Sequence, residues 1–219
     1  MSSPSARPMP SNDDILDIAT AAFAEKGFEG ARVDEIAKAA GVNKATLYYR
    51  IGDKDALYSA VLERIFAAKG TRMQHMLQTV EDPEERVRTF ARILVDGEHP
   101  EQFSAIMMRE VANGGRNLPD TVLPLMGRVV GALQQTLKDG VQQGRFNPVD
   151  PFLVHMMLMG ACSLYATNTP IRRRVAAMAP QGVSLNTEIS LIDAADTIAD
   201  MLLSGMRKTP DPQERPDHG

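Results

Sequence analysis

Residues 33–50 read VDEIAKAAGVNKATLYYR, and this stretch decides the fold because it has the spacing of two short helices joined by a tight turn. If Val33 is taken as the first position, Ala37 is fifth and Gly41 ninth. Leu47 is then the fifteenth, as a helix-turn-helix requires. A small side chain at Ala37 lets the helices cross closely, Gly41 can adopt the left-handed conformation of the turn, and Leu47 fills the wedge between the helices.

The second helix of this pair is predicted to present a surface suited to a DNA groove. Asn43 can cap its start, and an inward Leu47 leaves the neighbouring side chains facing outward. These outward side chains are Lys44, Ala45, Thr46, Tyr48 and Tyr49. Lysine can reach guanine or a phosphate, the methyl groups of Ala and Thr can touch thymine, and tyrosine hydroxyls can meet phosphates.

The rest of the chain predicts an all-α fold of about nine helices, because apolar residues recur at spacings of three and four and aromatic residues make up only 5%. We expect a three-to-four-helix DNA-binding domain followed by a helical ligand-binding and dimerisation domain. The expected divisions are a flexible arm over 1–10, the DNA-binding domain over 11–68, the second domain over 69–206 and a disordered tail over 207–219. The later helices are expected over about 53–68, 82–97, 103–113, 118–143, 150–169 and 187–206.

Composition sets limits on the function. The formal net charge of −4 does not favour nucleic-acid binding in general, so a DNA-binding face must be local. Lys44, Arg50 and Lys54 against Asp53 make the predicted strip locally positive. A single cysteine, Cys162, in an apolar helical run predicts a buried thiol in a reducing compartment. No apolar run is long enough to predict a membrane span, and no secretory signal precedes the first helix, so a cytoplasmic location is expected.

An enzyme is the main rival class of function. The four histidines do not form a His-Glu-x-x-His pattern, and the sequence contains no Gly-rich phosphate loop and no Gly-x-Ser-x-Gly. We therefore expect no catalytic residue, no metal and no cofactor. A helical adaptor that does not bind DNA is the second rival, and it would leave the exposed Lys44 and Tyr49 unexplained.

The stretch ILDIATAAFAEKGFEGARVDEIAKAAGVNKATLYYRIGDKDALYSAVLE, residues 15–63, closely resembles the N-terminal domain of the TetR family of regulators. The resemblance implies a homodimer whose paired recognition helices enter successive major grooves of a near-palindromic double-stranded operator. It also implies a divergent C-terminal domain that binds a small-molecule inducer, of unknown identity here, and most members repress. On the matching positions Lys44, Ala45, Thr46, Tyr48 and Tyr49 would face bases and backbone, Arg50 would face a phosphate, and Lys54 would make a contact from the fourth helix.

Two positions depart from the family pattern. Arg32 stands where the family usually has Ser or Thr at the start of the second helix, so it could reach a phosphate itself at the expense of a weaker cap. Ile51 replaces the usual aromatic residue, which keeps the core apolar but makes it smaller. With these positions, the predicted DNA-binding residues are Arg32, Asn43, Lys44, Ala45, Thr46, Tyr48, Tyr49, Arg50 and Lys54.

The second half of the chain offers weaker signals. Its methionines could form an adaptable ligand lining or an ordinary core. The basic run of Arg172, Arg173 and Arg174 is compatible with a solvated face or with an anionic ligand. The apolar helix after Asp150 and the last helix are the expected dimer seam. The candidate ligand-binding residues are Phe103, Met107, Met108, His155, Met159 and Tyr165, and Glu110 is a further candidate for a polar contact.

Overall fold

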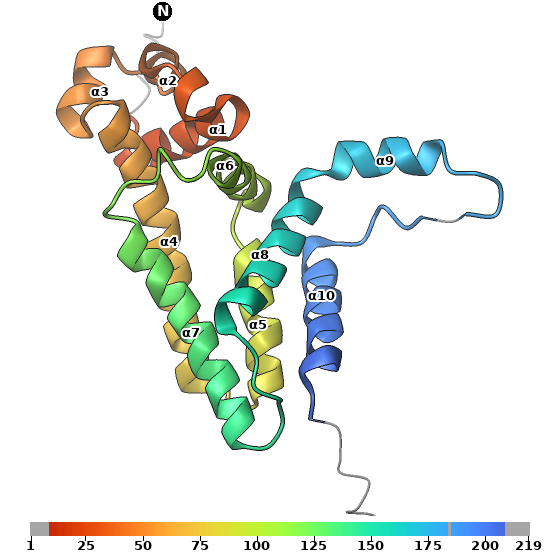
Figure 1. The fold of residues 1–219 in the computed structure, drawn as a ribbon. Coiled ribbons are helices and arrows are strands. Elements are labelled where there is room, and N and C mark those ends of the chain that lie inside the picture. The colour runs from red at the N-terminus through yellow and green to blue at the C-terminus, as the bar shows by residue number, and fades with distance from the viewer. Residues whose placement is uncertain (1–8, 184, 209–219) are drawn as a thin grey trace, which may run out of the picture. The chain divides into compact units, whose positions relative to one another are not determined.

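A computed structural model describes residues 9–183 and 185–208, which contain ten α-helices and no β-strand longer than an isolated bridge (Figure 1). The all-α prediction is confirmed. In chain order the helices are α1 Asn12–Gly30, α2 Val33–Ala39, α3 Lys44–Arg50, α4 Lys54–Thr79, α5 Pro83–Val95, α6 Pro100–Ala112, α7 Leu123–Gln142, α8 Pro151–Thr167, α9 Thr169–Ala177 and α10 Leu191–Met206. Most of the predicted N-terminal arm and C-terminal tail, residues 1–8 and 209–219, lies outside the described residues.

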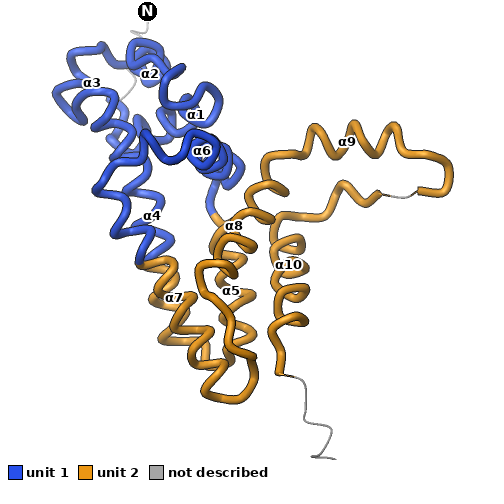
Figure 2. Tube along the Cα trace, in the orientation of Figure 1, with its two compact units in different colours: residues 1–70, 97–127 blue, residues 71–96, 128–219 orange. Residues whose placement is uncertain are grey.

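The chain divides into two compact units (Figure 2). Unit 1 comprises residues 1–70 and 97–127, and unit 2 comprises residues 71–96 and 128–219. Two of the boundaries fall inside helices, since α4 and α7 each contribute to both units. Helix α6 packs against α1 and therefore belongs to unit 1 with the helix-turn-helix.

The core of unit 1 is built on α1. Ser11 and Asp14 form a reciprocal capping box that starts this helix, and Ile15 and Phe23 are buried along its inner face. Gly27 interrupts the helix with φ 71°, a conformation that glycine adopts without strain, and the helix continues beyond this kink to Gly30. Tyr58 of α4 packs edge-on against Phe23 with ring centroids 4.8 Å apart. This aromatic contact anchors α1 to α4.

In unit 2, α5 packs against α8 and α10. Asp82 caps α5 and Pro83 opens it, close to the start predicted near residue 82, and Phe90 is fully buried on the inner face. Cys162 is buried in α8, which confirms the predicted thiol, and burial raises its pKa to about 11. Ala199 is buried on α10, where a short side chain allows close approach of the neighbouring helix.

Arginines of α5 connect it to α10 by ion pairs. Arg92 Nε lies 2.6 Å from Asp196 Oδ1, and Arg88 Nε lies 2.8 Å from Asp200 Oδ1. Because both arginines are partly covered, these contacts are screened less than fully exposed pairs. They fix the register of the two helices along one another.

Several helix boundaries differ from the sequence prediction, among them the start of α7, which lies at Leu123 instead of near residue 118. Helix α4 continues to Thr79 instead of ending near residue 68. The predicted stop before Pro170 holds for α8, but the same proline opens an additional helix, α9, since proline is tolerated in a first turn. Helix α10 starts at Leu191 because the Ser190 hydroxyl accepts from the Asp193 N–H and caps it there.

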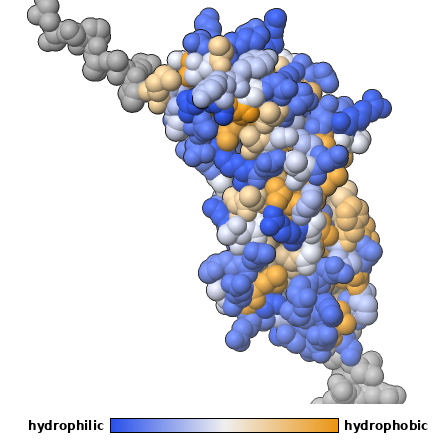
Figure 3. Space-filling model, turned by 90° about the vertical axis from the view of Figure 1, so that its left-hand side faces the viewer, coloured by the Kyte–Doolittle hydropathy of each residue, from blue (hydrophilic) through white to orange (hydrophobic). Residues whose placement is uncertain are grey.

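Hydrophilic side chains cover most of the face that Figure 3 shows, and hydrophobic ones form small groups between them. Apolar atoms contribute much of the surface of any folded protein, so small exposed apolar groups of this kind are normal. No helix among the described residues is long and apolar enough to cross a bilayer. The same residues contain no group of three or more His, Cys, Asp or Glu side chains placed to hold a metal ion.

Candidate nucleic-acid interface

The turn between α2 and α3 has the geometry that the spacing predicted. Ala37 is buried, and Gly41 adopts φ 71°, a left-handed conformation that favours glycine. The Gly41 N–H donates to the Lys38 carbonyl over 3.1 Å, and the Val42 N–H donates to the Ala37 carbonyl over 3.0 Å. These two bonds are the Schellman arrangement that closes a helix at glycine. The completely buried Leu47 then holds α3 against its neighbours.

Asn43 caps α3, as predicted. Its backbone is extended, and its side-chain Oδ1 accepts a 2.7 Å hydrogen bond from the Thr46 N–H. The cap satisfies one of the free N–H groups of the first turn. A DNA contact by Asn43 would therefore use its amide NH₂ or its backbone, because the oxygen is already engaged.

The outward face of α3 is open to solvent. Tyr49 is 92% exposed, and Tyr48 and Ala45 are also exposed, whereas Thr46 is half-buried. A tyrosine this exposed makes little contact with its own domain. Its ring and hydroxyl are therefore free to meet another molecule, which is what the sequence predicted for this position.

Lys44 has an acidic neighbour that the sequence analysis missed. Its Nζ lies 2.8 Å from Asp34 Oδ1 of α2 and 5.7 Å from the centroid of the Tyr48 ring. The hydrogen bond to Asp34 raises the pKa of Lys44 above its ordinary value. Both partners are largely exposed, and exposed pairs contribute little in water, so a phosphate can replace Asp34 at low cost.

The two basic residues expected at phosphates make contacts within unit 1. Arg50 donates from Nε to Asn12 Oδ1 over 2.9 Å and from Nη1 to the Pro10 carbonyl over 2.7 Å. Lys54 donates to the Glu29 carbonyl over 3.1 Å. These bonds attach α3 and α4 to the segments around α1, so a phosphate contact by either side chain would share or replace them.

Arg32 occupies the N-cap position of α2 with an extended backbone and an exposed side chain. Its side chain makes no capping hydrogen bond. The start of α2 therefore lacks the side-chain acceptor that Ser or Thr would supply, as expected.

The six predicted ligand-binding residues fall in different units. Phe103, Met107 and Met108 lie on α6 in unit 1, the first two buried and the third exposed. His155, Met159 and Tyr165 lie on α8 in unit 2. The structure thus does not gather the six within one unit.

His155 is the member of this set with an unsatisfied group. It is buried on α8 with its ring edge-on to Phe90, centroids 6.0 Å apart. Its Nδ1 has no hydrogen-bond partner among the described residues. Burial lowers the pKa of His155, so the neutral imidazole is favoured.

Glu110, the further candidate for a polar contact, has a specific position in unit 1. It is 2% exposed on α6, where Oε1 accepts a 2.8 Å hydrogen bond from the Tyr58 hydroxyl. The Asn117 backbone N–H lies 3.3 Å from Oε2. Burial, followed by the hydrogen bond to Glu110, raises the pKa of Tyr58. These residues border a cavity of about 330 Å³ between α1, α4 and α6.

Comparison with known proteins agrees with the geometry. Residues 15–61 match the family described as bacterial regulatory proteins, tetR family, and residues 83–182 match the tetracyclin repressor-like C-terminal domain. The chain is 29% identical over 200 residues to the HTH-type transcriptional repressor NicS of Pseudomonas putida, covering 90% of this chain and 92% of NicS. It is 26% identical over 195 residues to the HTH-type transcriptional regulator RutR of Escherichia coli, covering 88% and 89%.

Solved structures show the same fold. FadR from Bacillus subtilis, in complex with stearoyl-CoA, gives a TM-score of 0.67 at 18% identity and covers 89% of this chain and 99% of its own. PfmR from Thermus thermophilus gives 0.66 at 24% identity and covers 92% and 100%. AibR, in complex with isovaleryl coenzyme A and operator DNA, gives 0.59 at 22% identity and covers 88% and 96%.

The helix-turn-helix and the helical second part define the class of the protein as a DNA-binding transcriptional regulator. The chain belongs to the TetR family, because residues 15–61 and residues 83–182 both match domains of this family. The two relatives, which align with about nine tenths of the chain, are also transcriptional regulators.

Proposed function

We propose that this protein is a homodimeric repressor that reads a double-stranded operator with α3 and is released by a small organic molecule bound among its C-terminal helices. The observation that carries the DNA-reading part is the division of α3 into two faces. Leu47 is completely buried and fixes the helix, while Tyr49 on the other face is 92% exposed. A recognition helix needs this combination of a rigid inner face and a free outer one.

The dimensions and chemistry of α3 fit a major groove. Seven residues of α-helix are about 10 Å long, which is comparable to the groove width of about 12 Å. Lys44 supplies the charge, and its exposed pair with Asp34 can be exchanged for guanine O6 and N7 or for a phosphate. Ala45 offers a methyl group to thymine, and Tyr48 and Tyr49 offer hydroxyls to the backbone.

Repression and induction rest on separate support. NicS, a full-length relative, is a transcriptional repressor. Proteins of the same fold form complexes with stearoyl-CoA and isovaleryl coenzyme A, so the fold can accommodate an organic ligand. In this chain His155 has an unsatisfied nitrogen beside Phe90, and a ligand with one polar group would satisfy it.

The DNA-reading role is tested by gel-shift titration on the promoter region upstream of the protein's own gene. Tyr49→Ala and Lys44→Ala should each weaken binding by about 1 to 3 kcal/mol, and higher salt should weaken it steeply. Lys138→Ala removes an exposed lysine from α7 and should leave operator affinity unchanged. Absence of salt-sensitive binding to any such fragment would contradict the proposal.

Induction is tested by a metabolite screen using thermal shift, followed by gel shift with each binder. A true inducer should lower operator affinity, and His155→Ala should reduce its binding. If the tight binders leave operator affinity unchanged, the coupling between the two sites is absent.

A further inference from the structure

Residues 168–183 and 185–190 lie between α8 and α10, and they form a segment that we name the α9 projection. It consists of α9 and the returning chain, and it leaves the bundle of α5, α8 and α10 within unit 2 (Figures 1 and 2). Helix α9 has no buried residue. The projection therefore contributes little to the core of its own unit.

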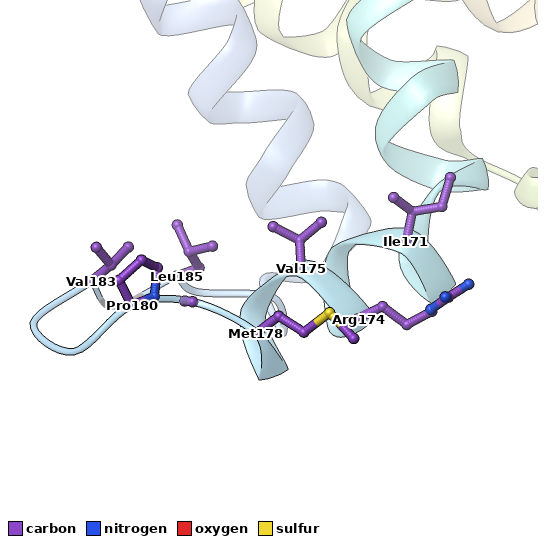
Figure 4. A pocket seen from close by; sticks show the side chains of 8 residues that line it. Ile171, Arg174, Val175, Met178, Pro180, Val183 and Leu185 are labelled. Carbon is purple, nitrogen blue, oxygen red and sulfur yellow. The ribbon is translucent and has the colours of Figure 1, made fainter.

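Large apolar side chains cover one side of the α9 projection. Ile171 is 63% exposed and Met178 is 79% exposed, and Val175 is more than half exposed. With Val183 and Leu185 they line a shallow cleft of about 540 Å³. Figure 4 shows Ile171, Val175, Val183 and Leu185 projecting from the same side of the segment.

The base of the projection is held firmly. The Arg172 guanidinium stacks 3.6 Å from the centroid of the Tyr165 ring, and the Tyr165 hydroxyl donates a 3.0 Å hydrogen bond to the Ile189 carbonyl. Arg173 pairs with Glu188 across the segment over 3.2 Å. The basic run thus has a structural role in addition to its partly solvated face, and it supports the segment that carries the exposed apolar side chains.

A second exposed apolar surface lies at the other end of α8. Phe152 is 61% exposed, and Leu153, Met156 and Met157 are exposed as well. Helix α8 has 17 residues and is therefore about 25 Å long. Its N-terminal face is thus distant from the projection that starts at its C-terminal end, and the exposure of Phe152 shows that the projection of the same chain does not cover it.

The combined exposed area of the two surfaces is comparable to that of a protein interface. A large apolar side chain offers roughly 200 Å² when nothing covers it, so these nine side chains leave on the order of 1,000 Å² exposed. A standard stable interface needs about 800 Å² from each partner. The area therefore matches what a stable dimer requires.

We propose that the α9 projection of one protomer packs over the N-terminal half of α8 of a second copy of this chain. A two-fold axis perpendicular to α8 sets the two copies of this helix antiparallel, which brings each projection beside the other protomer's Phe152. The cleft lined by Ile171 and Val175 then receives apolar side chains from the N-terminal turn of the other protomer's α8. The inference rests on the proposed homodimer and assigns to it a specific reciprocal contact.

Oligomeric state tests the contact. Sedimentation velocity should show a dimer for the unaltered protein, and Val175→Asp and Phe152→Asp should each raise the dimer dissociation constant at least about tenfold. Val111→Asp places the same charge at an exposed apolar position of unit 1 and should leave the dimer intact. Circular dichroism establishes that each variant is folded. A folded Val175→Asp variant with unchanged dimer affinity would overturn the proposal.

Cross-linking identifies which copy is contacted. Variants with one added cysteine, Val175→Cys or Phe152→Cys, carrying different mass tags, are mixed, allowed to exchange subunits and treated with a short bismaleimide. Buried Cys162 should react little. The expected product joins the two tags, and its absence in a mixture that has exchanged subunits overturns the contact. In a variant that carries both added cysteines, a cross-link found only at monomer mass would assign the projection to its own α8 and would likewise overturn the proposal.

The test of the dimer contact and the test of operator binding can fail independently of one another. A dimer that binds operator but is insensitive to Val175→Asp refutes the contact and leaves the proposed function standing. A dimer disrupted by Val175→Asp that shows no salt-sensitive operator binding refutes the proposed DNA reading and leaves the contact standing.

Discussion

Within unit 1, the Tyr58 hydroxyl on α4 donates a 2.8 Å hydrogen bond to the buried carboxylate of Glu110 on α6. The two residues are separated by 52 positions in the sequence, so only the folded chain brings them together. A buried carboxylate needs such donors, since it loses its hydration on folding. This bond therefore links α4 to α6 at the cavity they share with α1.

Tyr58→Phe should destabilise the protein by about 1 to 3 kcal/mol, because it removes a donor from a buried acceptor while the ring contact with Phe23 remains. The measurement is urea unfolding followed by circular dichroism, since the chain contains no tryptophan. Tyr48→Phe removes an exposed hydroxyl and should change the free energy of unfolding little. Equal effects of the two variants would contradict the structural role of the bond.

Gly140→Ala should destabilise unit 2 by about 1 to 3 kcal/mol through overpacking. A Cβ at Gly140 would collide with the fully buried Phe146 ring, at only 2.1 Å from its Cδ2 atom. Gly131→Ala is a matched change on the same helix with nothing within 4 Å, and it should stabilise by roughly 0.5 to 1 kcal/mol. Thermal unfolding of both variants compares them, and a stabilised Gly140→Ala would refute the packing.

Glu84 should make stability depend on pH in the acid range. Its hydrogen bond to Arg207, aided by Arg145, lowers its pKa from the ordinary value of 4.5 to about 2. A carboxylate with a lowered folded-state pKa stabilises above pH 4.5 and loses that contribution as pH falls towards 2. The stability difference between the unaltered protein and Glu84→Gln should therefore shrink over this window in urea titrations. A difference that stays constant from about pH 6 to 2 would exclude this linkage.

Arg32→Ser should stabilise α2 by about 0.5 to 2 kcal/mol, because it supplies the missing cap and places a serine three residues before Glu35, as in a capping box. If Arg32 also contacts a phosphate, the same variant should bind operator more weakly and reduce the salt dependence by about one phosphate contact. Unfolding and salt-titrated gel shifts measure the two effects independently. Stabilisation with unchanged DNA affinity would leave Arg32 without a role in binding.

The helix-turn-helix follows from local sequence. The order of Ala37, Gly41 and Leu47 leaves little freedom, since a close crossing, a left-handed turn and a wedge must occur within fifteen positions. The cap at Asn43 and the start of α5 at Asp82 were predictable for the same reason, as capping involves neighbours two or three residues apart. Composition and periodicity were sufficient for the all-α class.

Tertiary structure decided the features that depend on distant partners. Helix α4 continues past residue 68, although its apolar pattern weakens there, and Arg50 and Lys54 engage carbonyls around α1 that no local pattern reveals. The candidate ligand residues fall in two units because α6 joins unit 1 through its contacts with α1. The sequence by itself determined the class of fold and the helix-turn-helix, since both follow from short-range periodicity and turn chemistry. Only the folded chain decided which charges are engaged and which apolar faces remain uncovered, because these depend on contacts between residues far apart in the sequence.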